Sequence, residues 1–319
     1  MQITITTFNV ENLFNRFEFL DQPWDQKNDG GFDHALDAAV TAGGRERPRP
    51  YEISVIQRNN TAQAILDAAP DILAVQEIED LHTLRIFNAS FLDDYFEQMI
   101  SIEGNDRRGI DVGLLLRKGL GAEILNLRTH ADEAINGGHV RRGIGYIFPE
   151  PIFSRDCLEA DIQINGRPLT FLVNHFKAQD KRAAKANVTK RRRQAERVAE
   201  IALAVEQRGR LPIVLGDLNV DRHHPVIAGD DSLTPLLNLK NLQDPFPADT
   251  WTHYYVPAKN TSRLDYVLPH HDLKVAETKI GRQGLTAKCK QYTGPRYPTI
   301  GAELTEASDH CPTSVVLDI

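Results

Sequence analysis

Short runs of apolar residues, each bounded by residues that favour turns, recur along most of the chain and predict β-strands. The predicted strands cover residues 2–10, 71–76, 111–117, 158–164, 169–176, 212–215, 264–268 and 313–319. Several of these runs are apolar at consecutive positions rather than at every second one, which indicates strands covered on both faces. We therefore expect sheets with another layer of the protein on each side.

Two other segments carry apolar residues at helical spacing. The first runs from about residue 52 to 69 and stops before Pro70, and the second runs from about residue 189 to 208 and stops before Gly209. Helices and strands therefore mix without regular alternation. This order favours two packed sheets with helices outside them over a doubly wound parallel sheet, and the expected fold class is α/β (α+β).

The length and composition are those of a globular protein, with 319 residues, of which 41% are hydrophobic and 25% charged. Length alone leaves one or two domains open. Because no linker separates two apolar segments of domain size, we expect a single domain over residues 1–319. Polar segments at about 21–50 and 281–306 carry no strand or helix pattern, and we interpret them as surface insertions.

The net charge of −7 does not suit a protein that coats nucleic acid, so any contact with a polyanion is expected to be local. Cys157, Cys289 and Cys311 lack metal-finger or redox spacing and are expected to be buried or indifferent thiols in a reducing compartment. No apolar run is long enough for a membrane anchor, and the first residues alternate like a strand. We expect a cytoplasmic protein without an obligate protein partner. The alternative is that a leader has been trimmed from the chain.

Polar side chains with catalytic potential follow the ends of the predicted strands. They are Asn9, Glu77, His175, Asp217, Asn219, Asp265, Asp309 and His310. A rigid sheet can hold such groups at the mouth of a cleft. Taken singly, each has a structural explanation as a turn or cap residue. Turn formation alone does not explain why acids, amides and imidazoles occur together in these places.

These segments resemble the motifs of the endonuclease/exonuclease/phosphatase family, a deoxyribonuclease I-like group of metal-dependent phosphohydrolases. The resemblance extends in the family's order from TFNVEN at residues 7–12, through LTFLVNHFK and PIVLGDLN, to SDHCP at residues 308–312. It implies a four-layered α/β sandwich, in which two mixed sheets face each other between outer helices. It also implies an active site at one end of that sandwich.

The resemblance further implies a role for each matching residue. Glu77 matches the carboxylate that binds the catalytic Mg²⁺, and Asn9 matches an amide at or near the metal's ligand shell. Asp217 matches the residue that activates or positions the attacking water, and Asn219 matches the residue that orients the nucleophile and the phosphate.

The remaining matches concern histidines and their acidic neighbours. His310 matches an imidazole that contacts the scissile phosphate, and Asp309 beside it matches a metal ligand or an acceptor for metal-bound water. His175 matches a second imidazole that faces the phosphate, with Asp265 as the carboxylate that orients it.

The chemistry of phosphoester hydrolysis agrees with such a set of residues. An anionic phosphate repels hydroxide, so a catalyst has to neutralise charge and aim a water molecule. Sites rich in Asp and Asn and poor in Cys suit Mg²⁺, with Mn²⁺ as a possible substitute. Motifs for a serine or cysteine nucleophile and for a phosphate-binding P-loop are lacking in the sequence, so the expected nucleophile is water.

A basic run over residues 181–193 precedes and enters the second predicted helix. It serves either to grip the phosphates of a polyanion or as a solvated helix face, and we hold both interpretations open. The candidate substrate-binding residues are Arg108, Lys177 and Arg192. Asp111 is expected to be structural, with a substrate contact as the alternative.

Adjacent histidines occur twice, at residues 223–224 and 270–271. On a regular backbone neighbouring side chains point in different directions, so we expect both pairs to be exposed loop residues.

Three functions remain in competition on the sequence alone. The first is a Mg²⁺-dependent phosphodiesterase that hydrolyses nucleic acid, either as an endonuclease or as an exonuclease. The second is a phosphohydrolase on small-molecule or lipid phosphoesters, such as an inositol phosphatase or a sphingomyelinase. The third is a non-catalytic binding module, which the presence of every expected residue disfavours. Substrate choice lies in the loops, so the sequence names neither the substrate nor the number of metal ions.

Overall fold

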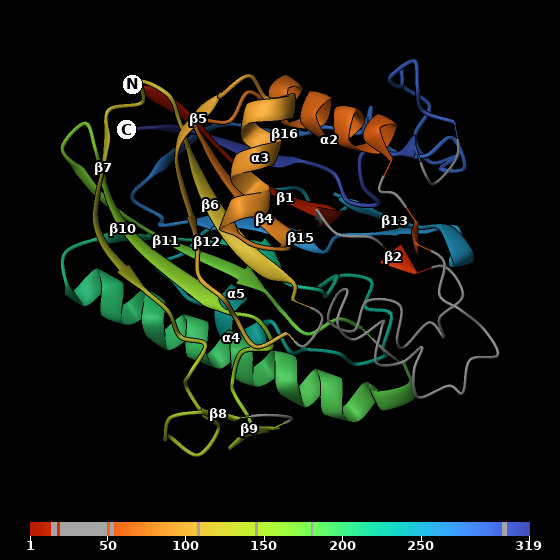
Figure 1. Ribbon diagram of the computed structural model, residues 1–319. Coiled ribbons are helices and arrows are strands. Elements are labelled where there is room, and N and C mark those ends of the chain that lie inside the picture. The colour runs from red at the N-terminus through yellow and green to blue at the C-terminus, as the bar shows by residue number, and fades with distance from the viewer. Residues whose placement is uncertain are drawn as a thin grey trace.

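Two β-sheets packed face to face form the centre of the molecule (Figure 1). The computed structural model describes residues 1–13, 18–19, 50–51, 54–106, 109–143, 146–179, 181–301 and 305–319. One sheet has six strands in the order β16-β17-β1-β4-β6-β5, and the other has five in the order β15-β12-β11-β10-β7. Each sheet contains one parallel pair among antiparallel neighbours, so both are mixed.

The six-stranded sheet is built around the parallel pair of β1 and β4. Its strands are β1 (Gln2–Leu13), β4 (Ile72–Ile78), β5 (Phe96–Ser101), β6 (Asp111–Arg117), β16 (Lys274–Ile280) and β17 (Thr313–Asp318). The five-stranded sheet is built around the parallel pair of β11 and β12. Its strands are β7 (Ala122–Arg128), β10 (Cys157–Ile164), β11 (Arg167–His175), β12 (Leu211–Asp217) and β15 (Asp265–Pro269).

Helices cover the outer faces of both sheets (Figure 1). Apolar side chains of α2 (Val55–Ala68) and α3 (Leu81–Phe91) pack on the six-stranded sheet. The long α4 (Ala184–Gln207) and the short α5 (Thr234–Leu237) pack on the five-stranded sheet. A third apolar core lies between the sheets and includes Ile5, Leu114, Ile162 and Phe171. The four layers confirm the expected sandwich, and they explain why many strands are apolar on both faces.

Small hairpins and turns complete the described part of the chain. They are β2 (Glu18–Phe19) with β3 (Pro50–Tyr51), β8 (Arg141–Gly143) with β9 (Tyr146–Phe148), β13 (His253–Tyr255) with β14 (Asn260–Ser262), and the 3₁₀ turns η1 (Lys181–Ala183) and η2 (Val256–Ala258). No helix in this part is long and apolar enough to cross a membrane.

All eight predicted strands are present, with ends that differ by a few residues, and both predicted helices are found. The second helix begins earlier than predicted, at Ala184. Sequence patterns missed α3 and the strands β5, β7 and β16. These three strands lie at sheet edges, where one side is open to solvent and the apolar pattern is weak. For α3 a signal existed, because Asp80 caps the helix by accepting the backbone N–H of Thr83 at 2.7 Å.

The two expected insertions differ in how much of them is described. Residues 21–49 lie outside the described residues. The segment at 281–306, apart from residues 302–304, contains no strand or α-helix and is held to the body of the protein by buried side chains. Leu285 and Cys289 pack with Tyr254 and Cys311, and the guanidinium of Arg282 lies 4.1 Å from the ring of Trp251.

Candidate active site

Both parallel strand pairs direct their carboxyl ends to the same end of the sandwich. In the five-stranded sheet, His175, Asp217 and Asp265 lie side by side in register on β11, β12 and β15. Residues in register on adjacent strands have side chains on the same face of a sheet. In the six-stranded sheet, Asn9 and Glu77 lie at the corresponding ends of β1 and β4. The two sheets therefore contribute opposing halves of one site.

Unusual backbone conformations direct two of these side chains. Glu77 has a φ of 65° and lies at a bulge in the pairing of β4 with β6, between Gln76 and Ile78. Asn219 has a φ of 58°, a conformation that Asn tolerates better than most residues. A bulge can re-aim a side chain at the end of a sheet, and left-handed conformations are frequent at functional sites.

A glycine is required immediately before Asp217. Gly216 has a φ of 135°, and a Cβ added there would lie 1.9 Å from the backbone oxygen of Asn174 on β11. Only glycine allows the two parallel strands to approach so closely at this point. Gly216 therefore sets the position of Asp217 relative to His175.

Asp217 is the centre of the site. Its Oδ2 accepts hydrogen bonds from the amide nitrogens of Asn9 at 3.1 Å and Asn219 at 3.0 Å, and lies 3.4 Å from His175 Nε2. Its Oδ1 accepts the backbone N–H of Asn219 at 2.9 Å. Burial raises the pKa of Asp217 to about 7, with the nearby Asp265 adding to the rise and His310 opposing it.

His310 is paired with Asp265. Its Nδ1 lies 2.9 Å from Asp265 Oδ2, and its Nε2 lies 3.9 Å from Asp217 Oδ2. Thr252 holds the same Asp265 oxygen by donating its hydroxyl at 2.6 Å. Burial disfavours the imidazolium, but Asp265 and Asp217 outweigh it and raise the pKa of His310 well above its ordinary value. The geometry therefore favours a cationic His310 facing Asp217.

The expected pairing of Asp265 with His175 is wrong. Asp265 is bonded to His310 and Thr252, and Asp217 lies between it and His175 in the register of the sheet. The order of strands decides this, because β12 separates β11 from β15. The spacing of motifs along the sequence does not show which strands become neighbours in the sheet.

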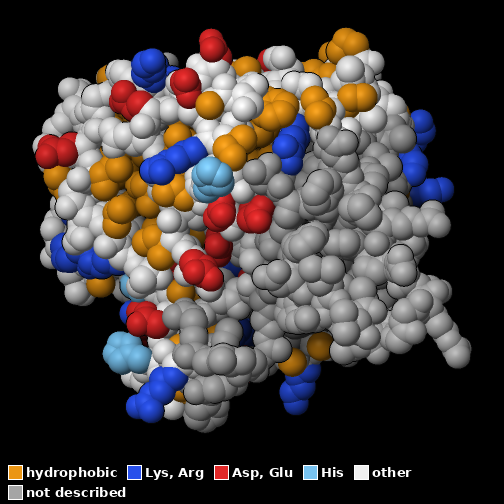
Figure 2. Space-filling model, in the orientation of Figure 1, with side chains coloured by type: hydrophobic (Ala, Val, Ile, Leu, Met, Phe, Trp, Pro, Cys, Tyr) orange, Lys and Arg blue, Asp and Glu red, His pale blue; other side chains and the backbone are white. Residues whose placement is uncertain are grey.

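Acidic side chains crowd the open side of the site. Glu77 Oε1 lies 3.3 Å from Asn9 Nδ2 and 3.9 Å from His175 Nε2. Burial raises the pKa of Glu11 well above its ordinary value, and repulsion from Asp309, Glu306 and Glu77 adds to this rise. Figure 2 shows acidic side chains gathered near the middle of the face seen in Figure 1.

This donor set fits a hard divalent cation. The side chains of Glu77 and Asp309 are 19% and 31% exposed, whereas those of His175 and Asp217 are each only 2% exposed. The two more open carboxylates could thus bind an ion that also keeps water molecules, as Mg²⁺ prefers. A cation would also relieve the repulsion at Glu11. Asn9 presents its nitrogen to the carboxylates, while its Oδ1 accepts the backbone N–H of Glu11 at 3.0 Å.

The structure brings together every residue of the predicted catalytic and metal-binding set. Contacts of 3.9 Å or less join them, whether directly or through a shared partner. The sequence-based analysis missed Glu11, Thr252, His253 and Ser308. The hydroxyl of Ser308 donates to the backbone oxygen of Asn9 at 2.7 Å and joins the two ends of the chain at the site. Glu11 lies within TFNVEN and Ser308 within SDHCP, which was an available signal, whereas Thr252 and His253 lie outside the recognised motifs.

The two candidate substrate-binding residues that the structure describes, Lys177 and Arg192, contact residues outside this set. Arg108 lies outside the described residues. Lys177 follows the end of β11, and its backbone N–H donates to Gln194 Oε1 on α4 at 2.9 Å. Arg192 pairs with Asp231 at 3.0 Å and with Glu196 at 3.2 Å.

Asp111 and the adjacent histidines have structural surroundings. Asp111 is 5% exposed and accepts the backbone N–H of Gly104 at 2.8 Å. The expectation that residues 270–271 are both exposed is wrong for His270, which is 2% exposed and lies 3.3 Å from Glu206 Oε1. The 270–271 pair is held in a turn after β15, so the two imidazole rings stack with their centroids 4.5 Å apart. His223 and His224 are exposed, as expected.

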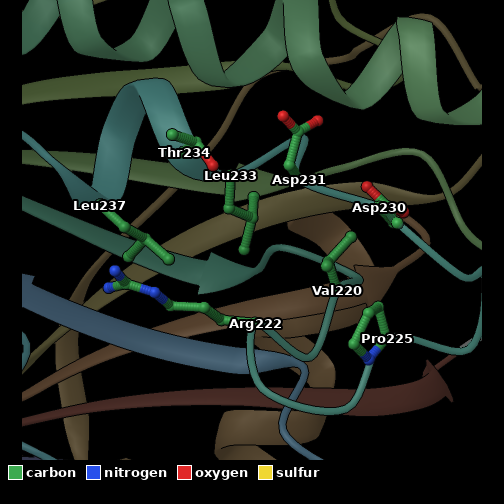
Figure 3. Close-up of a pocket in the computed structure, with 9 residues that line it drawn as sticks. Val220, Arg222, Pro225, Asp230, Asp231, Leu233, Thr234 and Leu237 are labelled. Carbon is green, nitrogen blue, oxygen red and sulfur yellow. The ribbon is translucent and has the colours of Figure 1, made fainter.

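A separate pocket of about 320 Å³ lies beside the loop that follows β12 (Figure 3). It is lined by Val220, Arg222, Pro225, Gly229, Asp230, Asp231, Leu233, Thr234 and Leu237. The figure shows Leu233 and Leu237 to the left of Val220 and Pro225. None of the predicted catalytic or metal-binding residues belongs to this lining.

Known proteins resemble the chain in sequence motifs and in fold. The family model for the endonuclease/exonuclease/phosphatase family matches residues 6–310. No curated protein is a significant match in sequence.

Several solved structures share the fold at low identity. A family protein from Bacteroides thetaiotaomicron is 17% identical with a TM-score of 0.62, over 100% of this chain and 99% of that one. A mannosyl-6-phosphatase from the same species is 16% identical with a TM-score of 0.58, over 99% and 100%. TDP2 from Caenorhabditis elegans is 14% identical with a TM-score of 0.60, over 100% and 76%. Because the family model covers nearly the whole chain, this protein belongs to the endonuclease/exonuclease/phosphatase family.

Proposed function

We propose that the protein is a divalent-metal-dependent phosphodiesterase that hydrolyses nucleic acid by direct attack of water. Membership of the family assigns the chain to phosphoester hydrolysis. The observation that carries the proposed mechanism is the cluster around Asp217, where a buried carboxylate meets two imidazoles and two amides. A water molecule beside this cluster would have an acceptor for its proton, and a phosphate would have cationic and neutral donors.

The residues divide the work according to their surroundings. Asp217, whose pKa is raised to about 7, can accept the proton of the attacking water near neutral pH. Asn9 and Asn219 hold its oxygens in place. His310, kept cationic by Asp265, donates to the phosphate oxygens as negative charge develops. His175, whose Nε2 lies 3.4 Å from Asp217 Oδ2, would donate to the leaving oxygen.

A divalent cation adds charge neutralisation. Glu77 and Asp309 would hold Mg²⁺ or Mn²⁺, which would offset the charge of the phosphate group when bound. The residues of the chain then orient the water and move its proton.

We favour nucleic acid as the substrate because exposed cations lie near the site. Lys181, Lys185 and Arg193 are exposed, and no carboxylate among the described residues pairs with them. They lie on η1 and the first half of α4. Arg191 on α4 donates to the backbone oxygen of Lys177, two residues beyond His175, so this part of α4 borders the site. Cations in such a place could contact several phosphates of a polyanion.

A phosphatase that acts on a smaller phosphoester is the alternative. Other cations of the basic run are neutralised within the protein, because Lys190 pairs with Glu150 and the buried Arg191 pairs with Asp230. The likeness in fold to a mannosyl-6-phosphatase leaves a phosphate monoester possible. Fold alone does not decide between these substrates.

A substrate panel tests the proposal. Single-stranded DNA, duplex DNA, RNA, bis(p-nitrophenyl) phosphate and a set of sugar phosphates and inositol phosphates are incubated with purified protein and Mg²⁺ or Mn²⁺. We expect cleavage of nucleic acid that stops with a chelator and resumes with added metal. Hydrolysis of a monoester while all nucleic acids stay intact would support the phosphatase instead.

Removing the exposed cations separates binding of a polyanion from the chemical step. Replacing Lys181, Lys185 and Arg193 with Ala should raise KM for nucleic acid. It should also make binding less sensitive to salt: the slope of log binding constant against log salt concentration should become shallower by about one for each lost phosphate contact. Hydrolysis of bis(p-nitrophenyl) phosphate should be unchanged. The matched control is a triple alanine variant that removes three exposed cations from the other end of the sandwich, namely Lys118, Arg167 and Lys240. Equal effects of both triple variants would refute a role for the basic run.

A further inference from the structure

Two histidines face one carboxylate at the edge of the site. His253 Nε2 lies 3.4 Å from Asp309 Oδ2, and His310 Nε2 lies 3.8 Å from Asp309 Oδ1. The centroids of the two imidazole rings are 4.7 Å apart. The proposed mechanism uses His310 but has no role for His253, which the family motifs did not single out.

The other nitrogen of each imidazole is already held. His310 Nδ1 is bonded to Asp265 at 2.9 Å, and His253 Nδ1 lies 3.1 Å from the hydroxyl of Ser262. Ser262 is the partner of His253 in the β13–β14 hairpin, so the backbone fixes this contact. Histidines that bind metals generally have one nitrogen anchored in this way, which orients the ring and leaves the other nitrogen as the ligand.

The donor atoms suit a transition metal better than Mg²⁺. One ligand atom from each of His253, Asp309 and His310 lies within 4.8 Å of the others. Around a tetrahedral Zn²⁺, with bonds of about 2.0–2.2 Å, ligand atoms lie about 3.4 Å apart, so modest side-chain movement closes the site. Asp309 is also partly exposed, which gives the ion an entry path and open positions for water. Imidazole nitrogen favours Zn²⁺ over Mg²⁺, which selects oxygen.

We propose that His253, Asp309 and His310 form a Zn²⁺ site that overlaps the hydrolytic site and inhibits it. Zn²⁺ bound to His310 Nε2 takes the place of the proton that this nitrogen would otherwise present to phosphate. It also occupies Asp309, which removes that carboxylate from the Mg²⁺-binding set. Zinc binding stands independently of the substrate, whereas the inhibition rests on the proposed function.

Direct binding is the first test. Metal-free protein is titrated with ZnCl₂ by calorimetry in the presence of excess Mg²⁺. We expect one Zn²⁺ per chain with micromolar or tighter affinity. His253→Phe, which keeps an aromatic ring against Tyr255 and His310, should weaken binding at least about 100-fold, and Ser262→Ala about 10-fold.

A second histidine cluster provides the matched control. His270, His271 and Asp272 also place ligand atoms within 4.8 Å of one another, after the far end of β15. His271→Ala with Asp272→Ala should leave the high-affinity Zn²⁺ site intact. Loss of binding in this variant, with normal binding by His253→Phe, would overturn the proposal. A melting temperature for each variant, measured without zinc, shows whether its fold is preserved.

Inhibition is the second test, with each rate compared to the same variant's own rate in Mg²⁺ alone. Zinc should inhibit the wild type near the affinity measured by calorimetry. The inhibitory concentration for His253→Phe should rise by the same factor as its dissociation constant. Zinc that binds tightly at His253 without slowing hydrolysis would overturn the proposed inhibition. An absence of hydrolysis with every substrate and metal would refute the proposed function, but it would leave the zinc-binding result standing.

Discussion

At the scale of single residues, the sequence predicted most of the side chains that belong to the site, but it did not predict which of them form hydrogen bonds with each other. Asn9, Glu77 and Asp217 were identifiable because each stands where an apolar run of the sequence gives way to polar residues, and the structure brings them into contact. The partner of Asp265 was assigned wrongly because it depends on strand order. Thr252 was missed because its role is to fix a carboxylate, and a threonine in a turn carries no distinctive pattern.

Asp217→Asn should reduce kcat by about 10²–10⁴-fold, because the amide keeps the shape of the carboxylate but cannot accept the proton of water. The hydrogen bonds from Asn9 and Asn219 define that shape. Steady-state kinetics at saturating Mg²⁺ measure the loss. Asp231→Asn, which changes an exposed carboxylate on the outer surface, is the control and should retain normal activity. A fully active Asp217→Asn enzyme would remove Asp217 from the chemical step.

Asp111 should make the protein less stable as the pH rises. Burial raises its pKa from 3.8 to about 7, so the folded state holds the proton more tightly than the unfolded state. The resulting stability is complete below pH 3.8 and is lost as the pH rises through about 7. Ionising the buried carboxyl of Asp111 in the folded state therefore costs about 4 kcal/mol of stability at high pH.

The neutral variant Asp111→Asn tests this assignment, since its side-chain oxygen can still accept the N–H of Gly104. Urea unfolding should show Asp111→Asn more stable than the wild type at pH 8, by up to about 4 kcal/mol, with the difference shrinking towards pH 4. A difference that does not change with pH would show that the Asp111 carboxyl has an ordinary pKa.

At the scale of elements, the strength of the apolar pattern decided what could be predicted. Strands such as β4 and β12, buried between other layers, are nearly continuous apolar runs. The edge strands β7 and β16 expose many of their side chains, and their sequences therefore look like loops. The predicted start of α4 lies too far along the chain, because the first turns of this helix are rich in polar and basic residues and carry no apolar stripe.

Gly216 should be the least replaceable glycine among those in the described strands. Gly216→Ala would force a Cβ against the backbone of β11 at a φ that L-residues avoid, so we expect a loss of about 3 kcal/mol or more in the free energy of unfolding. Gly209→Ala is the control, because that position also has a positive φ, of 74°, but has open space around it. It should cost only about 1 kcal/mol. Thermal or urea unfolding measures both, and equal costs would contradict the steric explanation.

At the scale of the whole molecule, the sandwich converts distant motifs into one site. The parallel pair in each sheet points its carboxyl end in the same direction, so residues as far apart in sequence as Asn9 and Asp217 form a hydrogen bond. Convergence of the motifs could be expected from the family resemblance. The pairing of Arg191 with Asp230 and of Arg192 with Asp231 could not be foreseen, because these two carboxylates lie some forty residues away in a loop.

The dependence of phosphodiester hydrolysis on Mg²⁺, measured side by side for the wild type and Glu77→Gln, tests the central claim most directly. For the wild type, the rate should rise to saturation with Mg²⁺, fall to background with a chelator and return when the metal is restored. Glu77→Gln should require far more Mg²⁺ and remain slower by at least about 10²-fold, because a neutral amide replaces the carboxylate that we propose binds the ion. A Glu77→Gln enzyme with the wild-type rate and the wild-type Mg²⁺ requirement would contradict the account.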